Sequence, residues 1–153
     1  MVLPDPKEQA RRFARVRSAH RAEMQEDYLE LIAELIAETG EARAADLAER
    51  FGVTAATVAN TLARLRRDGL IETQPYRSIF LTEEGRQVAA RSRARHLLVL
   101  DFLLSLGVSR EVAEMDAEGL EHHLSPETLA AMKAFSSRGS DAPGDPPPSR
   151  SPN

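Results

Sequence analysis

The sequence of 153 residues contains no cysteine and no tryptophan. Without cysteine the chain has no disulfide, thiolate zinc site or iron–sulfur cluster, so any metal site must be built from carboxylates and imidazoles. Long apolar runs are also missing, because the most apolar stretch, 97–106, is interrupted by Asp101 and is too short to span a bilayer. The N-terminus lacks the order of a signal peptide. We therefore expect a soluble protein of the reducing cytoplasm.

The charge of the chain is unevenly distributed, although the formal net charge is only −4. Residues 1–42 carry 6 basic and 9 acidic side chains, residues 43–95 carry 10 and 6, and residues 96–136 carry 2 and 7. An acidic protein does not bind nucleic acid indiscriminately. A basic middle between acidic segments instead predicts one surface that meets phosphate and another that holds cations.

The first segment divides into two parts. Residues 1–22 form a predicted basic N-terminal extension with five arginines, either a mobile arm or a helical continuation, and the prolines at 4 and 6 disfavour helix at the first positions. From 23 to 39 apolar residues recur at helical spacing, and Gly40 is a predicted helix end.

The basic middle has the element order of a winged helix-turn-helix, which we predict over 23–90. A helix at 44–51, a break at Gly52 and a helix from Thr54 to 67 precede two short β-rich runs, 70–74 and 78–82. Helix, turn, helix and hairpin in a basic stretch are typical of a DNA-reading unit. The alternative is a helical packing unit whose arginines are merely solvated.

If the second helix reads DNA, its buried side leaves a polar face for the major groove. Small residues allow close approach to bases, Thr and Asn hydrogen-bond base edges, and arginines contact phosphates. The predicted contacts on this helix are Thr54, Ala55, Ala56, Thr57, Asn60, Thr61 and Arg64. Those on the hairpin are Gln74, Tyr76 and Arg77.

The remainder is predicted to be helical, so the fold class is mainly α with a short β-hairpin wing. Thr82 caps a helix that either continues through 97–106 or breaks before it, Ser109 caps a shorter one, and Pro126 opens the last, to about residue 135. The apolar stretch exceeds the needs of one small core and indicates a subunit interface. We assign 91–136 to a helical dimerisation and metal-sensing domain, and 137–153 to a disordered tail rich in Pro and Ser.

Carboxylates and imidazoles recur at helical spacing in three places. Asp27 and Glu30 share one helix face, and Glu118, Glu121 and His122 are predicted to share one face of a single helical stretch. With His96 they form six candidate ligands for one cation or two bridged cations, of the Mn²⁺ or Fe²⁺ type. We expect His123 beside this site or on the surface, and His20 has no carboxylate partner at useful spacing.

Other interpretations of these groups remain open at this point. Acidic residues near helix ends often only complement the helix dipole or face solvent. A di-iron enzyme would show Glu-x-x-His pairs, which are missing, so we expect no enzyme. A winged-helix regulator that responds to an organic ligand is a third alternative.

Three motifs resemble the diphtheria-toxin-repressor (DtxR) family, in its manganese transport regulator (MntR) branch, over about 23–136: EDYLELI at 26–32, RHLL at 95–98 and DAEGLEHHLS at 116–125. The resemblance implies a homodimeric repressor of manganese-uptake genes that binds a palindromic DNA operator. It also implies that the six candidate ligands hold two Mn²⁺ ions per subunit, with Fe²⁺ as the alternative. Iron-responsive relatives carry methionine and cysteine where this chain has Asp27 and Glu121, which favours Mn²⁺. Asn60 stands where relatives often have lysine, so the operator sequence does not carry over.

Overall fold

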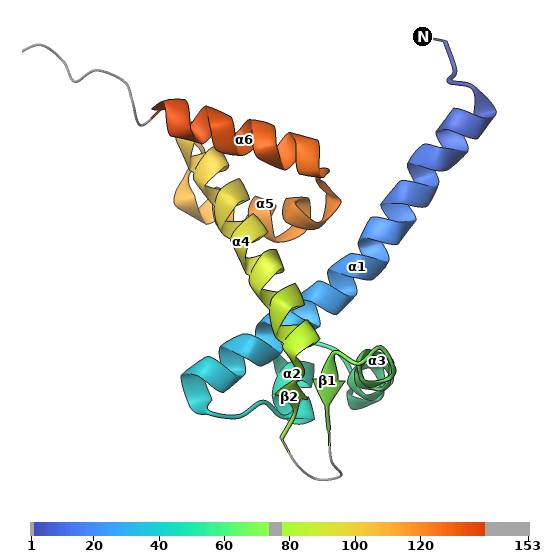
Figure 1. The fold of residues 1–153 in the computed structure, drawn as a ribbon, viewed down its shortest axis with the longest axis vertical. Coiled ribbons are helices and arrows are strands. Elements are labelled where there is room, and N and C mark those ends of the chain that lie inside the picture. Colours follow the sequence, from blue (N-terminus) through green and yellow to red (C-terminus); the bar gives the residue numbers. More distant parts are fainter. Residues whose placement is uncertain (1, 74–77, 140–153) are drawn as a thin grey trace, which may run out of the picture.

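A computed structural model describes residues 2–73 and 78–139 of the chain (Figure 1). The described part is mostly helical, and its strands form one short hairpin, which confirms the predicted fold class. The elements are α1 (Pro6–Thr39), α2 (Ala44–Phe51), α3 (Ala55–Arg67), β1 (Ile71–Glu72), β2 (Phe80–Leu81), α4 (Glu83–Ser105), α5 (Arg110–Leu120), the 3-10 helix η1 (Glu121–His123) and α6 (Pro126–Gly139).

Helix α1 begins at Pro6, much earlier than the helix predicted from residue 23. The Asp5 carboxylate accepts hydrogen bonds from the backbone N–H groups of Lys7 (3.0 Å) and Glu8 (3.3 Å). Pro6 takes the first helical position, where a missing N–H costs nothing. The arginine-rich segment is therefore the N-terminal part of α1, and Figure 1 shows it projecting from the rest of the molecule.

The C-terminal half of α1, helices α2 and α3 and the hairpin form what we call the winged unit. Thr54 caps α3 by accepting from the Thr57 N–H (3.2 Å), and Gly52 turns the chain before it with φ = 65°. In the hairpin Ile71 pairs with Leu81, and both side chains are buried. These features match the predicted helix-turn-helix and wing, with strands shorter than expected.

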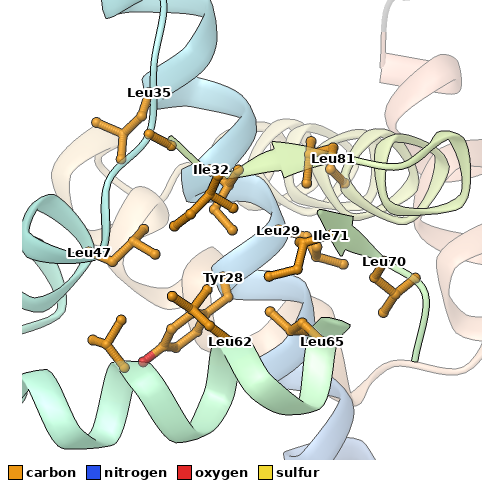
Figure 2. Packing of buried hydrophobic residues seen from close by; sticks show 14 residues of the cluster. Tyr28, Leu29, Ile32, Leu35, Leu47, Leu62, Leu65, Leu70, Ile71 and Leu81 are labelled. Atoms are coloured by element: carbon orange, nitrogen blue, oxygen red, sulfur yellow. The ribbon is translucent and has the colours of Figure 1, made fainter. Parts of the chain in front are cut away.

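The core of the winged unit forms around α1 (Figure 2). Tyr28, Leu29 and Ile32 are almost completely buried, and the Tyr28 ring stacks on Phe51 of α2 with centroids 4.4 Å apart. Each of these side chains contributes about 1.5–3 kcal/mol by leaving water. The side chains that surround them come from α2, α3 and the hairpin region: Leu47, Val58, Leu62, Leu65, Leu70, Ile71, Ile79 and Leu81.

Helix α4 continues without a break into the apolar stretch 97–106 and ends at Ser105, with Leu106 as its C-cap. With α5, η1 and α6 it forms the helical unit, whose core includes Val99 and Ala113. Leu97 and Leu106 stay about half exposed in the single chain, as expected of a subunit interface. None of the helices in the described ranges has the length and apolar character needed to cross a membrane.

The winged and helical units are joined by helices that both of them share. Helices α1 and α4 cross and pack against each other (Figure 1). The predicted boundary after residue 22 lies inside α1, and the one after residue 90 lies inside α4. Residues 137–139 of the predicted disordered tail belong to α6, where Ser137 Oγ donates to the carbonyl of Lys133 (3.0 Å); residues 140–153 lie outside the described part.

Gly85 lies in the first turn of α4, against the backbone that enters the hairpin. A Cβ atom at this position would lie 2.0 Å from the carbonyl oxygen of Leu70. We expect Gly85→Ala to lower the free energy of unfolding by about 3 kcal/mol, because backbone must move to relieve the clash.

Urea unfolding of the metal-free protein measures this effect. Gly119→Ala is the matched control, since Gly119 is also helical and a Cβ there meets nothing within 4 Å. Equal stability of the two variants would contradict the packing of α4 on the hairpin.

Candidate metal centre and nucleic-acid interface

The six predicted ligands converge where α1, α4 and the α5–η1 segment meet. Asp27 and Glu30 come from α1, His96 from α4, and Glu118, Glu121 and His122 from α5 and η1. Contacts join all three of these segments. We call this set of six residues the candidate metal centre, or the centre.

Glu121 occupies the middle of the centre. Its Oε2 lies 2.9 Å from His96 Nδ1, and its Oε1 lies 3.2 Å from His122 Nε2. The two carboxylate oxygens therefore face two different imidazoles. Glu121 is only 1% exposed, so these contacts are shielded from water.

Asp27 and Glu30 are the two candidate ligands from α1, and each contacts a different neighbour. Asp27 Oδ1 lies 2.9 Å from His122 Nε2. Glu30 accepts a hydrogen bond from the buried Ser92 hydroxyl of α4. Burial raises the pKa of Glu30; the Ser92 hydrogen bond opposes this shift, and the nearby Glu118 carboxylate adds to it.

Glu118 is exposed, unlike Glu121 and His122, and the expectation that these three residues share one face of a single helix was wrong. The segment 118–122 is not a single α-helical stretch, because α5 ends at Leu120 and a 3-10 turn follows. The tighter turn carries Glu121 and His122 into the interior, whereas the Glu118 side chain stays 70% exposed. Glu118 Oε1 lies 3.9 Å from His96 Nδ1, at the rim of the centre.

Two buried atoms of the centre lack a hydrogen-bond partner within the described residues. They are Glu121 Oε2 and His122 Nε2. Each lies close to other polar atoms without hydrogen-bond geometry, which is the arrangement expected of groups that surround a common cation. Carboxylates and imidazoles without thiolates fit a divalent ion of the Mn²⁺ type.

The charges of the centre also favour the binding of a cation. Burial raises the pKa of Glu121 to about 8, although nearby His122 opposes the shift. Burial lowers the pKa of His122, but the nearby carboxylates of Asp27 and Glu26 outweigh this effect and raise it to about 10. Carboxylates crowded in a shielded site favour any positive charge placed among them.

Glu26 supports the centre and was not predicted. Its Oε2 lies 2.6 Å from His122 Nδ1, so it can orient the imidazole and leave Nε2 directed at Asp27 and Glu121. Arg95 of α4 donates to the same carboxylate. Burial raises the pKa of Glu26, but the hydrogen bonds from His122 and Arg95 lower it by more.

The two remaining histidines meet at Glu23, one turn before Asp27 on α1. His20 Nδ1 lies 3.3 Å from Glu23 Oε2, so the expectation that His20 has no useful carboxylate partner was wrong. His123 Nε2 lies 3.2 Å from the same oxygen, and its position beside the centre agrees with expectation. Helical spacing from His20 to Glu23 was the one signal that could have indicated this pair.

The predicted DNA-contacting face of α3 is exposed. Its members, with the cap residue, are Thr54, Ala55, Ala56, Thr57, Asn60 and Arg64. Thr61 is the exception, because it is 5% exposed and its hydroxyl donates to the Thr57 carbonyl (3.1 Å), so it is not available to a groove. Thr61 lies three residues after Val58 and four before Leu65, which is the spacing of the buried face, so helical periodicity was the signal that could have indicated its burial. Gln74, Tyr76 and Arg77 lie outside the described residues.

Two family models match the chain. Residues 21–79 match the N-terminal DNA binding domain of iron dependent repressors. Residues 82–147 match the iron dependent repressor metal binding and dimerisation domain. Together they cover both units and every predicted ligand.

Individual relatives agree with these models. The transcriptional regulator MntR of Escherichia coli O157:H7 is 52% identical over 136 residues, which are 89% of this chain and 88% of the relative. The Salmonella typhimurium (strain LT2) MntR is 53% identical over 87% of this chain and 85% of its own. A solved structure described as a manganese-dependent transcriptional repressor in complex with manganese has a TM-score of 0.67 and 30% identity. That match covers 74% of this chain and 52% of the other, so this chain spans about half its length.

Glu26 yields a test of how His122 is held. We expect Glu26→Gln to weaken Mn²⁺ binding by about 10- to 100-fold, because residues that orient metal-binding imidazoles have effects of this size. Calorimetric titration of the metal-free protein measures the affinity. Glu8→Gln is the control, since Glu8 lies on the same helix and its exposed carboxylate pairs with Arg11 and Arg12. Unchanged affinity in Glu26→Gln would show that this hydrogen bond does not support the centre.

Proposed function

This chain belongs to the iron dependent repressor family, whose members are transcriptional regulators rather than enzymes, and we propose that it is a manganese-responsive repressor of manganese-uptake genes. The observation that carries the proposal is the position of Glu121. Its two oxygens face two imidazoles at the point where the DNA-binding and dimerisation parts of the chain meet. Because a repressor must reach genomic DNA, we propose that it acts in the cytoplasm.

The donor set supports Mn²⁺ as the effector. Four carboxylates and two imidazoles form an oxygen-rich site without sulfur, which suits Mn²⁺ better than thiolate-seeking metals. We propose two ions per subunit, held by Asp27, Glu30, His96, Glu118, Glu121 and His122. Glu121 can contribute one oxygen to each ion, which supports a bridged pair.

Metal binding can control DNA binding because α1 belongs to both parts of the molecule. On α1, Asp27 and Glu30 flank Tyr28 and Leu29, which are core residues of the winged unit. His96 and Glu121 are fixed to the helical unit. Bound cations would supply the positive charge that lets carboxylates from both units share one site. Without that charge the carboxylates repel one another, and the α1–α4 arrangement is less constrained.

The expected target is a palindromic operator bound by a homodimer. Twofold symmetry presents two copies of α3, and a fixed spacing of about 34 Å between them matches one turn of DNA. The exposed Thr57, Asn60 and Arg64 supply base-edge and phosphate contacts. Linkage then requires operator DNA to tighten metal binding by the factor by which metal tightens DNA binding.

Gel retardation on the upstream region of a manganese-transporter gene tests the metal-dependent function. The wild-type protein should retard this DNA with Mn²⁺ and release it with EDTA. Glu121→Ala and His122→Ala should each abolish the Mn²⁺-dependent shift, because each removes a central ligand, while sedimentation shows an intact dimer.

Parallel lanes with Fe²⁺ and Zn²⁺ compare other effectors. Specific retardation that persists in EDTA would contradict a metal switch and favour an organic ligand or none. A normal Mn²⁺-dependent shift with Glu121→Ala would contradict the six-residue centre.

Arg64 tests the separation of DNA contact from metal sensing. Arg64→Ala should weaken operator binding and reduce the slope of log affinity against log salt by about 1 per subunit, because one phosphate contact is lost. The Mn²⁺ isotherm of the DNA-free protein should not change. Arg110→Ala is the control, since Arg110 is also exposed but lies on α5. A shifted metal isotherm in Arg64→Ala would argue against this division of roles.

A further inference from the structure

Glu23 lies within reach of the centre although it is not one of the six predicted ligands. It precedes Asp27 by one helical turn of α1, so both side chains share a face. One ligand atom each from Glu23, Asp27 and His122 lie within 4.8 Å of one another. Two carboxylates and one imidazole at these separations can contact a single ion.

The surroundings of His122 Nε2 are the second observation that points to a bound cation beside Glu23. The side chain is fully enclosed, and Asp27 Oδ1 and Glu121 Oε1 lie 2.9 and 3.2 Å from Nε2 without hydrogen-bond geometry in the described part of the chain. A ring nitrogen that carboxylate oxygens approach without hydrogen-bond geometry is the arrangement expected of groups that surround a common cation. Its other ring nitrogen contacts Glu26, so Nε2 is the atom left for a metal.

The Glu23 carboxylate is also held in place from two sides. His20 Nδ1 and His123 Nε2 lie 3.3 and 3.2 Å from its Oε2. Carboxylates that bind metals are commonly fixed by such outer hydrogen bonds. His20 belongs to the arginine-rich part of α1 and His123 to η1, so this contact joins the extension to the centre.

We propose that Glu23 is a seventh ligand of the centre and contacts the divalent cation bound by Asp27 and His122. The inference rests on the proposed function, since it assumes that Mn²⁺ occupies the centre. In this arrangement His20 and His123 are positioning residues, and metal binding fixes the N-terminal part of α1 as well as the two units. A purely structural role, in which Glu23 only pairs with two surface histidines, predicts no effect on metal binding.

Mn²⁺ titration of the metal-free full chain separates these roles. Glu23→Gln should weaken one of the two Mn²⁺ binding steps by at least about tenfold and leave the other unchanged. Glu34→Gln is the matched control: it removes the same charge one turn beyond Glu30, as Glu23 lies one turn before Asp27, and Glu34 contacts the exposed Arg93 (3.7 Å). Equal isotherms for Glu23→Gln and Glu34→Gln would overturn the proposal.

A second experiment detects direct contact without depending on affinity. The chain has no cysteine, so Glu23→Cys introduces its one thiol. With Co²⁺ as the probe, a thiolate that reaches the ion produces a near-ultraviolet charge-transfer band. The band should appear in Glu23→Cys and be absent from Glu34→Cys. Absence from both variants, with Co²⁺ bound, would overturn the proposal.

Glu121→Ala distinguishes failure of the inference from failure of the proposed function. If Glu121→Ala loses Mn²⁺ binding while Glu23→Gln binds normally, the centre stands and Glu23 is not a ligand. If Glu121→Ala binds Mn²⁺ normally, the proposed centre itself is wrong. Circular dichroism checks that each variant retains its helical content.

Discussion

The Glu121 carboxylate is buried where α1, α4 and η1 meet, and its two oxygens face different imidazoles. A buried carboxylate without compensating positive charge costs several kcal/mol, so this position constrains everything around it. The surrounding residues respond to that constraint: His96 and His122 approach it, Glu26 holds the far side of His122, and Ser92 holds Glu30. The candidate ligands are thus held in an arrangement that can bind cations.

The consequence for regulation follows from the continuity of α1. One turn of this helix carries Asp27 toward the centre and Tyr28 into the core of the winged unit, where it stacks on Phe51. A movement of α1 relative to α4 therefore also moves the winged unit. Because packed interiors transmit displacement rather than absorb it, ligand groups on α1 are well placed to set the direction of α3. The same helix extends past Glu23 into the arginine-rich segment, which brings that segment under the same constraint.

Local signals in the sequence predicted much of this structure, and long-range contacts explain part of what was missed. Thr54, Thr82 and Ser109 were predicted as caps because a cap depends on a few neighbouring residues, and all three accept from backbone N–H groups. The convergence of the six candidate ligands was also expected, through spacing and family resemblance. The early start of α1 was missed although its signals are local: Pro6 takes the first helical position and Asp5 caps the helix. Thr61 was assigned to the DNA-contacting face although it has the helical spacing of its buried neighbours Val58 and Leu65. The 3-10 turn at Glu121 forms where the chain meets α1 and α4, and periodicity does not report such contacts. Glu26 was missed for two reasons. Its partner His122 is distant in sequence, and Glu26 itself is next to Asp27, a more obvious candidate ligand.

The central claim is that cations in the centre fix the spacing of the two α3 helices in a dimer. The chain lacks cysteine, so Ala59→Cys on the exposed side of α3 accepts one spin label per subunit. Pulsed electron paramagnetic resonance should show a broad range of label distances in EDTA. With diamagnetic Cd²⁺ in place of paramagnetic Mn²⁺, the distribution should narrow to a separation compatible with one DNA turn, about 34 Å between the helices. An identical distribution with and without metal would contradict the account.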